Sequence, residues 1–235
     1  MDKFILEQPW GGLGDNLQFS TLPELCYNNG IDFYLSSNNV YRNLEIKKLV
    51  WDNNPYVKGI IDEPSNAGGK FGNDMMTLMS QGYNHIESVE LSHGLTPTNS
   101  LPIIYYKPKY NESFKDKTVV CLGSVSSDYD EDVLINTVKN LVGEDENVIE
   151  LTFSYDVCEN NSTYGNHKVY NIGYEKHYLI DIFEHCDIIF SANKYICLFS
   201  GNSVLSSAIN KNNTIVITKH INSHYYFKNL KYIAI

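Results

Sequence analysis

Arginine is almost absent: Arg42 is the only one in 235 residues, and the formal net charge is −10. A protein that binds a nucleic-acid backbone needs a surplus of positive side chains, so this shortage argues against nucleic acid as the main partner. It leaves open a nucleotide ligand, whose phosphates main-chain N–H groups can hold. No stretch approaches the ~18 consecutive apolar residues of a membrane-spanning helix. Because Glu7 and Pro9 interrupt the first apolar run, we also expect no secretory signal.

Paired cysteines and metal-binding patterns are also missing. The five cysteines are odd in number and form no C-x-x-C pair, which predicts reduced core thiols and a cytoplasmic location, in the host cell if the chain is viral. No H-E-x-x-H pattern occurs, and the one D-x-D triplet, Asp128-Tyr129-Asp130, stands at an expected helix start, where acidic residues are favoured in any case. We therefore expect no cofactor and a metal-independent mechanism.

Apolar runs alternate with helix-compatible stretches and turn formers throughout the chain, which predicts an α/β protein with parallel sheets. The expected strands are 3–8, 31–36, 56–62, 87–91, 117–122, 147–153, 167–172, 187–192 and 214–218. The expected helices are 16–28, 41–52, a short one after 75, 131–142, 175–185 and 204–210. A proline-rich polar stretch near 97–116 predicts a boundary between domains 1–110 and 111–235. Both halves repeat one layout, which predicts two Rossmann-like doubly wound lobes with ligands at the carboxyl ends of their strands.

A glycine-rich turn follows the first strand. Gly11, Gly12 and Gly14 permit positive φ and a close approach of a ligand to main-chain N–H groups, which favours an anionic or polyhydroxylated ligand. Asp15 stands in the expected first turn of the helix, facing whatever the glycines admit. The alternative is structural: Asp15 and Gln18 have the spacing of a helix N-cap and its partner.

Serine-rich turns follow two expected strands of the second half. Residues 200–203 (Ser200, Gly201, Asn202 and Ser203) open a helix and are candidates to bind a diphosphate through N–H groups and hydroxyls. In the alternative, Gly201 only turns the chain and Ser203 caps the helix. Ser124, with Ser126 and Ser127, stands where a doubly wound sheet offers N–H groups to phosphate, although loop serines are more often solvated. The aromatic tail 225–227 suits the core, or stacking on a base or sugar.

The glycine turn and the segment Thr21-Leu22-Pro23-Glu24-Leu25 together resemble the opening of glycosyltransferase family 9, the heptosyltransferase group. The segment from Ile172 to Ser203 resembles that family's nucleotide-sugar half. The resemblance implies a compact GT-B enzyme that transfers a sugar from a nucleotide-diphosphate donor to a glycan or other hydroxyl acceptor. Asp15 is the implied base, and Gly12, Gly14 and Asn16 are implied donor contacts. Gly173 and Tyr174 would lie along the base, and Glu159 is a candidate for the ribose or a surface carboxylate.

The chain departs from the family in its second half. Phe199 replaces the usual Asp before the Ser-Gly pair, Val204 replaces the His three residues after the Gly, and a lysine after the first strand is missing. The stretch between Ser191 and Ser200 is also several residues longer. These departures favour an alternative function, a nucleotide- or glycan-binding protein of the same fold without turnover. A nucleotide hydrolase with a single lobe is a third possibility.

Overall fold

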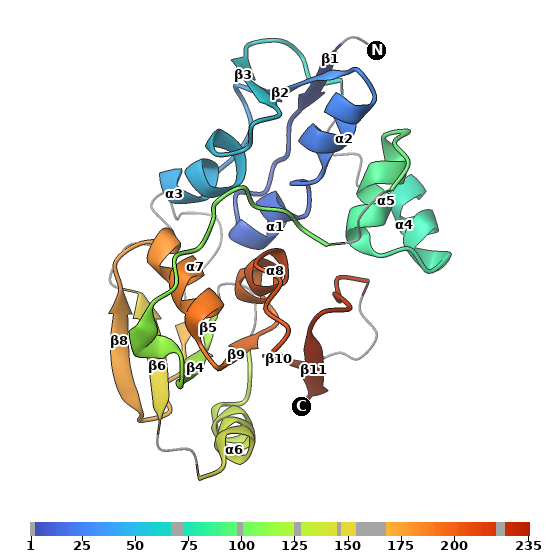
Figure 1. Cartoon of the computed structure of the whole chain (residues 1–235). Helices are drawn as coiled ribbons and strands as arrows, with labels where there is room; N and C mark the ends of the chain where they lie inside the picture. Colours follow the sequence, from blue (N-terminus) through green and yellow to red (C-terminus); the bar gives the residue numbers. More distant parts are fainter. Residues whose placement is uncertain are drawn as a thin grey trace. The chain divides into compact units, whose positions relative to one another are not determined.

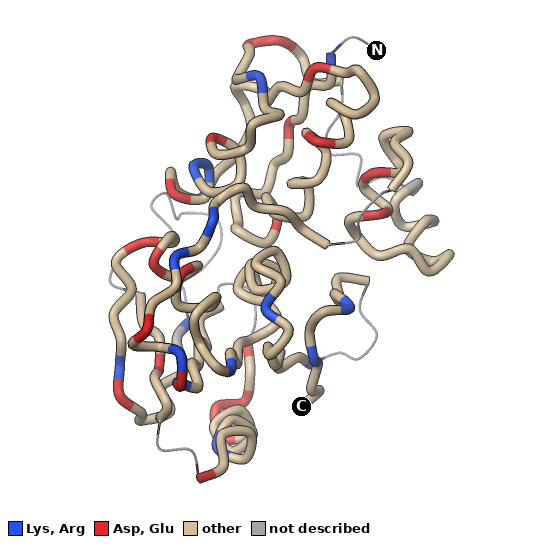
Figure 2. The backbone as a smooth tube through the Cα atoms, viewed as in Figure 1, with Lys and Arg blue, Asp and Glu red and all other residues tan. Residues whose placement is uncertain are grey.

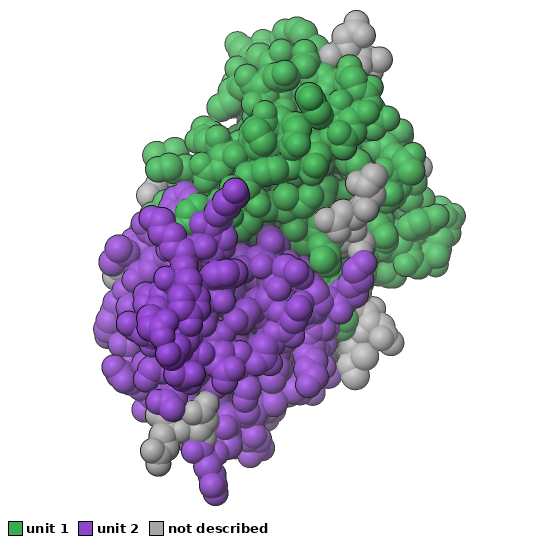
Figure 3. Space-filling view, viewed as in Figure 1, with its two compact units in different colours: residues 1–106, 224–227 green, residues 107–223, 228–235 purple. Residues whose placement is uncertain are grey.

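The computed structural model describes residues 3–66, 73–97, 101–124, 128–144, 147–153, 168–219 and 224–235. The chain divides into two compact units (Figure 3). Unit 1 comprises residues 1–106 and 224–227, and unit 2 comprises residues 107–223 and 228–235. Residues 224–227 thus pack with unit 1 although they follow most of unit 2 in sequence, a return that the predicted single boundary after residue 110 does not include.

Unit 1 is built on a parallel sheet of three strands in the order β1-β2-β3 (Figure 1). The strands are β1 (Lys3–Leu6), β2 (Asp32–Ser36) and β3 (Val57–Ile61). The helices are α1 (Leu13–Leu17), α2 (Leu22–Asn28), α3 (Leu44–Lys47), the π-helical η1 (Lys48–Asp52), α4 (Asn73–Ser80) and α5 (His85–Ser92). The strands follow one another across the sheet in chain order, so its described part is not doubly wound.

Aromatic side chains form the centre of the unit 1 core. The Phe4 and Phe33 rings stack with centroids 5.4 Å apart, and Phe33 stacks in turn on Trp51 at 6.1 Å. All three side chains are at most 2% exposed. Rings of this size bury enough apolar surface to attach η1 to the sheet, and this attachment fixes the loop that precedes α3.

The strand predicted at 87–91 is wrong, because these residues belong to helix α5. Asn84 caps the helix by accepting the main-chain N–H of Glu87, and the Glu87 carboxylate accepts that of Asn84. The alternation of apolar and polar residues in Val89-Glu90-Leu91 suggests a period of two. The buried positions Ile86, Val89 and Glu90 instead follow helical spacing, and the reciprocal cap decides the outcome.

Unit 2 contains a six-stranded parallel sheet in the order β11-β10-β9-β4-β6-β8. Its strands are β4 (Thr118–Cys121), β6 (Val148–Phe153), β8 (Glu175–Leu179), β9 (Lys194–Leu198), β10 (Thr214–Thr218) and β11 (Lys231–Ala234), and β5 (Gly123–Ser124) pairs separately with β7 (Lys168–Val169). The helices are η2 (Glu112–Phe114), α6 (Glu131–Val142), α7 (Ile182–Ser191) and α8 (Gly201–Ala208).

This strand order is doubly wound. The chain proceeds outward from β4 through β6 to β8, then returns to the other side of β4 and proceeds through β9 and β10 to β11. The direction therefore reverses between β4 and β9, which are hydrogen-bonded neighbours. Loops leave these two strands in opposite directions, so the carboxyl ends of β4 and β9 form the topological switch point where such sheets bind ligands.

The helix predicted at 175–185 and the strand predicted at 187–192 are wrong: the first begins as strand β8, and the second is the end of helix α7. The apolar run Ile188-Ile189-Phe190 suggests a buried strand. Asp181, however, caps the helix by accepting the N–H of Glu184, and the buried residues Ile182, Cys186 and Ile189 repeat with helical spacing. The strand that follows is β9, which ends only two residues before Ser200.

Acidic and basic residues are interspersed along both units (Figure 2). In the described part of the chain, no helix combines the length and the apolar character needed to cross a bilayer.

Candidate functional site

The glycine turn in unit 1 depends on close packing. A Cβ on Gly11 would lie 2.7 Å from the main-chain nitrogen of Arg42 and 2.9 Å from the carbonyl carbon of Tyr41. One on Gly12 would lie 2.6 Å from Asp15 Oδ2. None of Gly11, Gly12 and Gly14 has a positive φ, so the turn does not use the left-handed backbone that these glycines permit. The turn requires glycine because the loop before α3 and the Asp15 carboxylate approach too closely for a side chain.

Asp15 is the third residue of helix α1, with Gly12 as the N-cap residue. The Gly12 N–H donates to Asp15 Oδ2 over 3.1 Å. The predicted pairing of Asp15 as N-cap with Gln18 is therefore wrong, since Gln18 is the residue at the opposite end of this helix. Asp15 nevertheless stabilises the helix start, because its carboxylate lies at the positive end of the helix dipole.

The electrostatic surroundings of Asp15 act in opposite directions. Burial raises the pKa of its carboxyl group, while the Arg42 guanidinium and the hydrogen bond from Gly12 lower it, and the net result is a raised pKa. The position that a Cβ on Gly12 would take lies 2.6 Å from Asp15 Oδ2 and 3.4 Å from Arg42 Nη2. The carboxylate and the guanidinium therefore both lie beside Gly12. A half-buried carboxylate with a raised pKa beside a cation is suited to accept a proton.

Asn16 supports this turn from inside. Its side chain is completely buried, its amide donates to the Gly12 carbonyl over 2.9 Å, and its carbonyl accepts the Trp51 indole N–H over 2.7 Å. The prediction that Asn16 contacts a donor is corrected by this burial, because a ligand cannot reach the side chain. Gly14 is the second residue of α1 and is half-buried.

A second group of unit 1 residues adjoins α1. His85 Nδ1 lies 3.1 Å from Gln18 Oε1, and the His85 main-chain N–H donates to the His224 carbonyl over 2.8 Å. The ring of Tyr225 packs on His85 with centroids 4.7 Å apart. Burial lowers the pKa of His85 to about 4, so its ring is neutral at pH 7. Sequence reasoning noticed the aromatic tail but did not place it beside His85, because the contact joins residues far apart in the chain.

In unit 2 the turn between β9 and α8 is a helix cap. Ser200 is the N-cap residue, and its hydroxyl accepts the Asn202 N–H over 3.3 Å. The Ser203 hydroxyl donates to the Ser200 carbonyl over 2.8 Å and accepts the Ser200 N–H over 3.4 Å. The alternative in which Gly201 turns the chain and Ser203 caps the helix is therefore wrong in detail, since Ser200 is the cap and Ser203 its partner. Gly201 has no positive φ.

Asn202 joins this turn to the loop after β4. Its amide donates to the Gly123 carbonyl over 3.1 Å and to Cys121 Sγ over 3.3 Å. The predicted residues around Ser124 and Ser200 are thus brought together at the switch point. The side chains of Ser124, Asn202 and Ser203 are at most 8% exposed, so their polar atoms face inward. Half-buried Ser200 and Gly201 are the predicted residues that a ligand can reach here.

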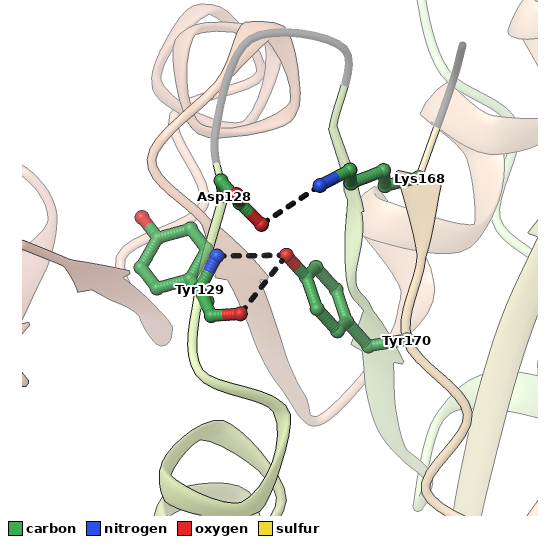
Figure 4. A network of polar contacts seen from close by, with 4 residues as sticks. All are labelled: Asp128, Tyr129, Lys168 and Tyr170. Carbon is green, nitrogen blue, oxygen red and sulfur yellow. Dashed lines mark hydrogen bonds and ion pairs between the residues drawn. The ribbon is translucent and has the colours of Figure 1, made fainter.

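A polar network borders the same edge of the sheet (Figure 4). The Tyr129 N–H donates to the Tyr170 hydroxyl over 2.8 Å, and Lys168 Nζ lies 2.8 Å from Asp128 Oδ1. Lys219 Nζ lies 5.3 Å from the centre of the Tyr129 ring. Lys168 and Lys219 are two cations near the switch point that sequence reasoning missed, because β7 and the end of β10 become neighbours of the β4 loop only in the folded sheet.

The carboxylates of the D-x-D triplet have structural partners. Asp128 pairs with Lys168, and Asp130 caps α6 by accepting the Val133 N–H over 3.0 Å. Within the described ranges, no group of three or more His, Cys, Asp or Glu side chains is arranged to hold a metal ion.

The segment predicted to lie along a nucleotide base is held by a buried carboxylate. Glu150, 1% exposed on β6, accepts the Ile172 N–H at 3.2 and 3.3 Å from its two oxygens. Gly173 is exposed with φ of +93°, and Tyr174 packs partly against the core. Glu150 was not among the predicted site residues. Glu159, Ser126 and Ser127 lie outside the described residues.

Comparison with solved structures identifies the architecture. The dodecameric iron-containing glycosyltransferase TibC from enterotoxigenic E. coli H10407 superposes with a TM-score of 0.68 at 14% identity, over 98% of this chain and 61% of TibC. The fold is that of the heptosyltransferases. E. coli WaaC, solved with ADP, gives 0.60 at 12% identity over 98% and 92% of the two chains. The family 9 enzyme of Veillonella parvula gives 0.58 at 8% identity over 100% and 86%.

These likenesses concern the fold. No family model and no curated protein matches the sequence. The chain spans about three fifths of the length of TibC. TibC has also been solved with ADP-D-β-D-heptose. The chain therefore has the α/β fold of the GT-B heptosyltransferases, with Rossmann-like lobes, as the resemblance in the glycine turn predicted.

The structure removes one of the departures from the family. The stretch between Ser191 and Ser200 looked several residues too long for the family because 187–192 was predicted to be the strand that leads into the serine turn. That strand is β9, and only Phe199 separates its last residue from Ser200. Phe199 and Val204 remain departures, and Val204 is buried at 6% exposure.

Proposed function

We propose that the protein is a glycosyltransferase that moves a sugar from a nucleotide-diphosphate donor to a hydroxyl acceptor. The main support is Asp15: a half-buried carboxyl group with a raised pKa, fixed on a glycine turn beside the only arginine. We assign this group, near the end of the first strand, the role of the base. The solved neighbours with ADP and ADP-heptose make an ADP-sugar the first donor to test.

In the proposed reaction, Asp15 accepts the proton of the acceptor hydroxyl while that oxygen forms a bond to the anomeric carbon of the donor sugar. The bond between this carbon and the diphosphate oxygen breaks, and the nucleoside diphosphate leaves with the bonding electrons. The Ser200–Gly201 turn would bind the diphosphate at the start of α8. Lys168 and Lys219 would supply positive charge as negative charge develops on the leaving group.

The proposal includes a metal-independent reaction in the cytoplasm. The leaving-group charge would be stabilised by lysines and helix N–H groups, so addition of EDTA should leave the rate unchanged. The four described cysteines are free and buried, which supports a reducing compartment.

The decisive experiment measures nucleoside diphosphate release from a panel of nucleotide sugars that includes ADP-heptose. Asp15→Asn keeps an oxygen that can accept the Gly12 N–H but cannot take a proton, and we expect kcat to fall roughly 10²- to 10⁴-fold. Asp32→Asn, on the surface beside Lys58, is the matched control and should retain wild-type turnover. Turnover in the Asp15→Asn variant equal to that of the control would refute the assigned base.

A second function is favoured by Phe199 and Val204. These residues stand where the resembled family usually has an acid and a histidine. Without those two groups, the chain would bind a nucleotide or glycan but would not transfer a sugar. Calorimetry with ADP and ADP-heptose separates the two functions. Binding accompanied by no diphosphate release from any donor would support the binding protein, whereas release that depends on Asp15 supports the enzyme.

A further inference from the structure

A cavity of about 380 Å³ lies in unit 2, at the edge of the sheet opposite the switch point. It is lined by Lys117, which directly precedes β4, by Ile149, the second residue of β6, and by residues 175–177, which begin β8. These positions mark the amino ends of parallel strands. Strands of this length span roughly 13–20 Å, so the cavity is separate from the Ser200 turn at their carboxyl ends.

The most deeply buried residues of the lining are apolar. Phe114 and Ile149 are each 6% exposed. The Phe114 ring meets the His177 imidazole edge-on, with centroids 5.2 Å apart and ring planes at 89°. His177 Nε2 lies 3.0 Å from Glu184 Oε1, and the other oxygen of this carboxylate accepts the Ile180 N–H over 2.7 Å. The imidazole is therefore fixed beside an apolar surface that suits a ring-sized group.

The segment 109–114, which forms part of the lining, is attached to helix α7. The Lys109 N–H donates to Asp187 Oδ1 over 2.8 Å, and the Asn111 N–H donates to Ser191 Oγ over 2.7 Å. These bonds join the segment to a long, well-buried helix. The cavity is thus formed without a ligand, as small-molecule sites usually are.

Positive side chains border the apolar surface. Lys117 is half-buried and Lys176 is exposed. Among the described residues, neither ammonium group takes part in an ion pair. Glu175, the one carboxylate among the described lining residues, is exposed and does not pair with them. In a chain with a net charge of −10, two such cations beside a cavity make a local site for negative charge.

We propose that this cavity binds a small aromatic anion, a single ring that carries a phosphate or carboxylate group. The ring packs on Phe114 and Ile149, and Lys117 and Lys176 bind the negative group. A cavity of about 150 Å³ is large enough for benzene, so this one has room for the anionic group as well. The inference goes beyond the proposed sugar transfer, because none of these residues belongs to that reaction and binding is measured without a donor.

Proton–nitrogen NMR of the full chain, titrated with phenyl phosphate and separately with benzoate, tests the site. We expect the amide signals of Ile149 and His177 to shift with at least one probe, and that of Gly201, at the opposite edge, to stay in place. The stronger of the two probes identifies the anionic group. Inorganic phosphate lacks the ring and phenol lacks the charge, so each should bind roughly tenfold more weakly or less.

Two results of this titration would overturn the proposal. One is the absence of any shift at Ile149 and His177 with both probes. The other is a shift at Gly201 that ADP reverses, because the anion would then occupy the Ser200–Gly201 turn.

Substitutions assign the binding to the two lysines. Lys117→Gln removes the half-buried charge and should raise the Kd of the stronger probe roughly tenfold. Lys176→Gln, on the surface of β8, should raise it about threefold and serves if the first variant does not fold. Lys139→Gln is the matched control, because it makes the same charge change on exposed α6, outside the lining, and should leave the Kd unchanged. Equal Kd values in wild type and both cavity variants, or an equal loss in Lys139→Gln, would refute the site.

Discussion

The two units position their candidate sites by different means. In unit 2 the strand order itself creates the site, because the chain reverses direction between β4 and β9 and Asn202 joins the two loops that leave them. In unit 1 the sheet has no such reversal among its described strands, and the site depends on side-chain packing around Gly11 and Gly12. A site made by topology should tolerate substitution better than one made by close packing.

Each unit also buries a glutamate side chain, and the two differ in what surrounds the carboxyl group. Glu150 in unit 2 is 1% exposed and accepts a main-chain N–H from Ile172. Glu90 in unit 1 is completely buried, and burial raises its pKa to about 7. The nearby Thr21 hydroxyl offsets this increase only in part. Unit 1 therefore contains an acid that folding makes harder to ionise.

The largest expected effect is on the pH dependence of stability, through Glu90→Gln. Because the folded-state pKa of about 7 exceeds the ordinary 4.5, the unfolded state releases its proton first as the pH rises. The contribution of this group to stability is fully present below pH 4.5 and is lost as the pH rises through 7. At pH 8 the Gln variant should therefore be more stable by on the order of 3 kcal/mol, as measured by urea unfolding between pH 5 and 8.

Ser88→Ala is the control for Glu90→Gln, since Ser88 is on the same helix, is equally buried and does not titrate in this range. It should shift the free energy of unfolding by a constant amount at every pH. A wild-type protein whose stability does not decline between pH 5 and 8 would contradict the assignment to Glu90.

The next prediction compares a glycine that close packing requires with one that only its backbone conformation requires. Gly11→Ala places a methyl group against main-chain atoms of Tyr41 and Arg42, which must move, and we expect a loss of about 2 kcal/mol. Gly143, after helix α6 in unit 2, has φ of +66° and open space where a Cβ would stand. Gly143→Ala should cost about 1 kcal/mol through backbone strain alone. Thermal unfolding compares them, and equal losses would show that packing at Gly11 is not special.

Sequence reasoning reached most of the fold because its elements carry local signals. The strands around Phe33 and Val119, the helix at 131–142 and the glycine turn all follow from apolar runs and turn formers. It failed at 87–91, where an alternating pattern suggested a strand, and at 187–192, where an apolar run did, and helix caps at Asn84 and Asp181 decided otherwise. Those caps are visible in the sequence, as Asn or Asp three residues before Glu, and greater weight on them would have corrected both errors.

The candidate site was less accessible to sequence reasoning. Asp15 and Ser200 were found because they closely follow strands. The side chains that hold or surround them, such as Arg42 and Asn202, act through contacts between segments distant in the chain. A single sequence gives no information on such contacts. It also cannot show that Asn16 and Ser203 are buried, which turns expected ligand contacts into supports.

The smallest effect compares one buried asparagine from each unit, Asn16 in unit 1 and Asn202 in unit 2. Asn16→Ala leaves the buried Trp51 indole N–H without its acceptor and removes the bond to the Gly12 carbonyl, so we expect a loss of about 1.5 kcal/mol. Asn202→Ala removes one good hydrogen bond, to Gly123, and a weaker one to sulfur, and should cost about 1 kcal/mol. Urea unfolding measures both. If topology fixes the unit 2 site, Asn202→Ala should leave nucleotide affinity near wild type in calorimetry. A large loss of affinity would show that this site, too, depends on side-chain packing.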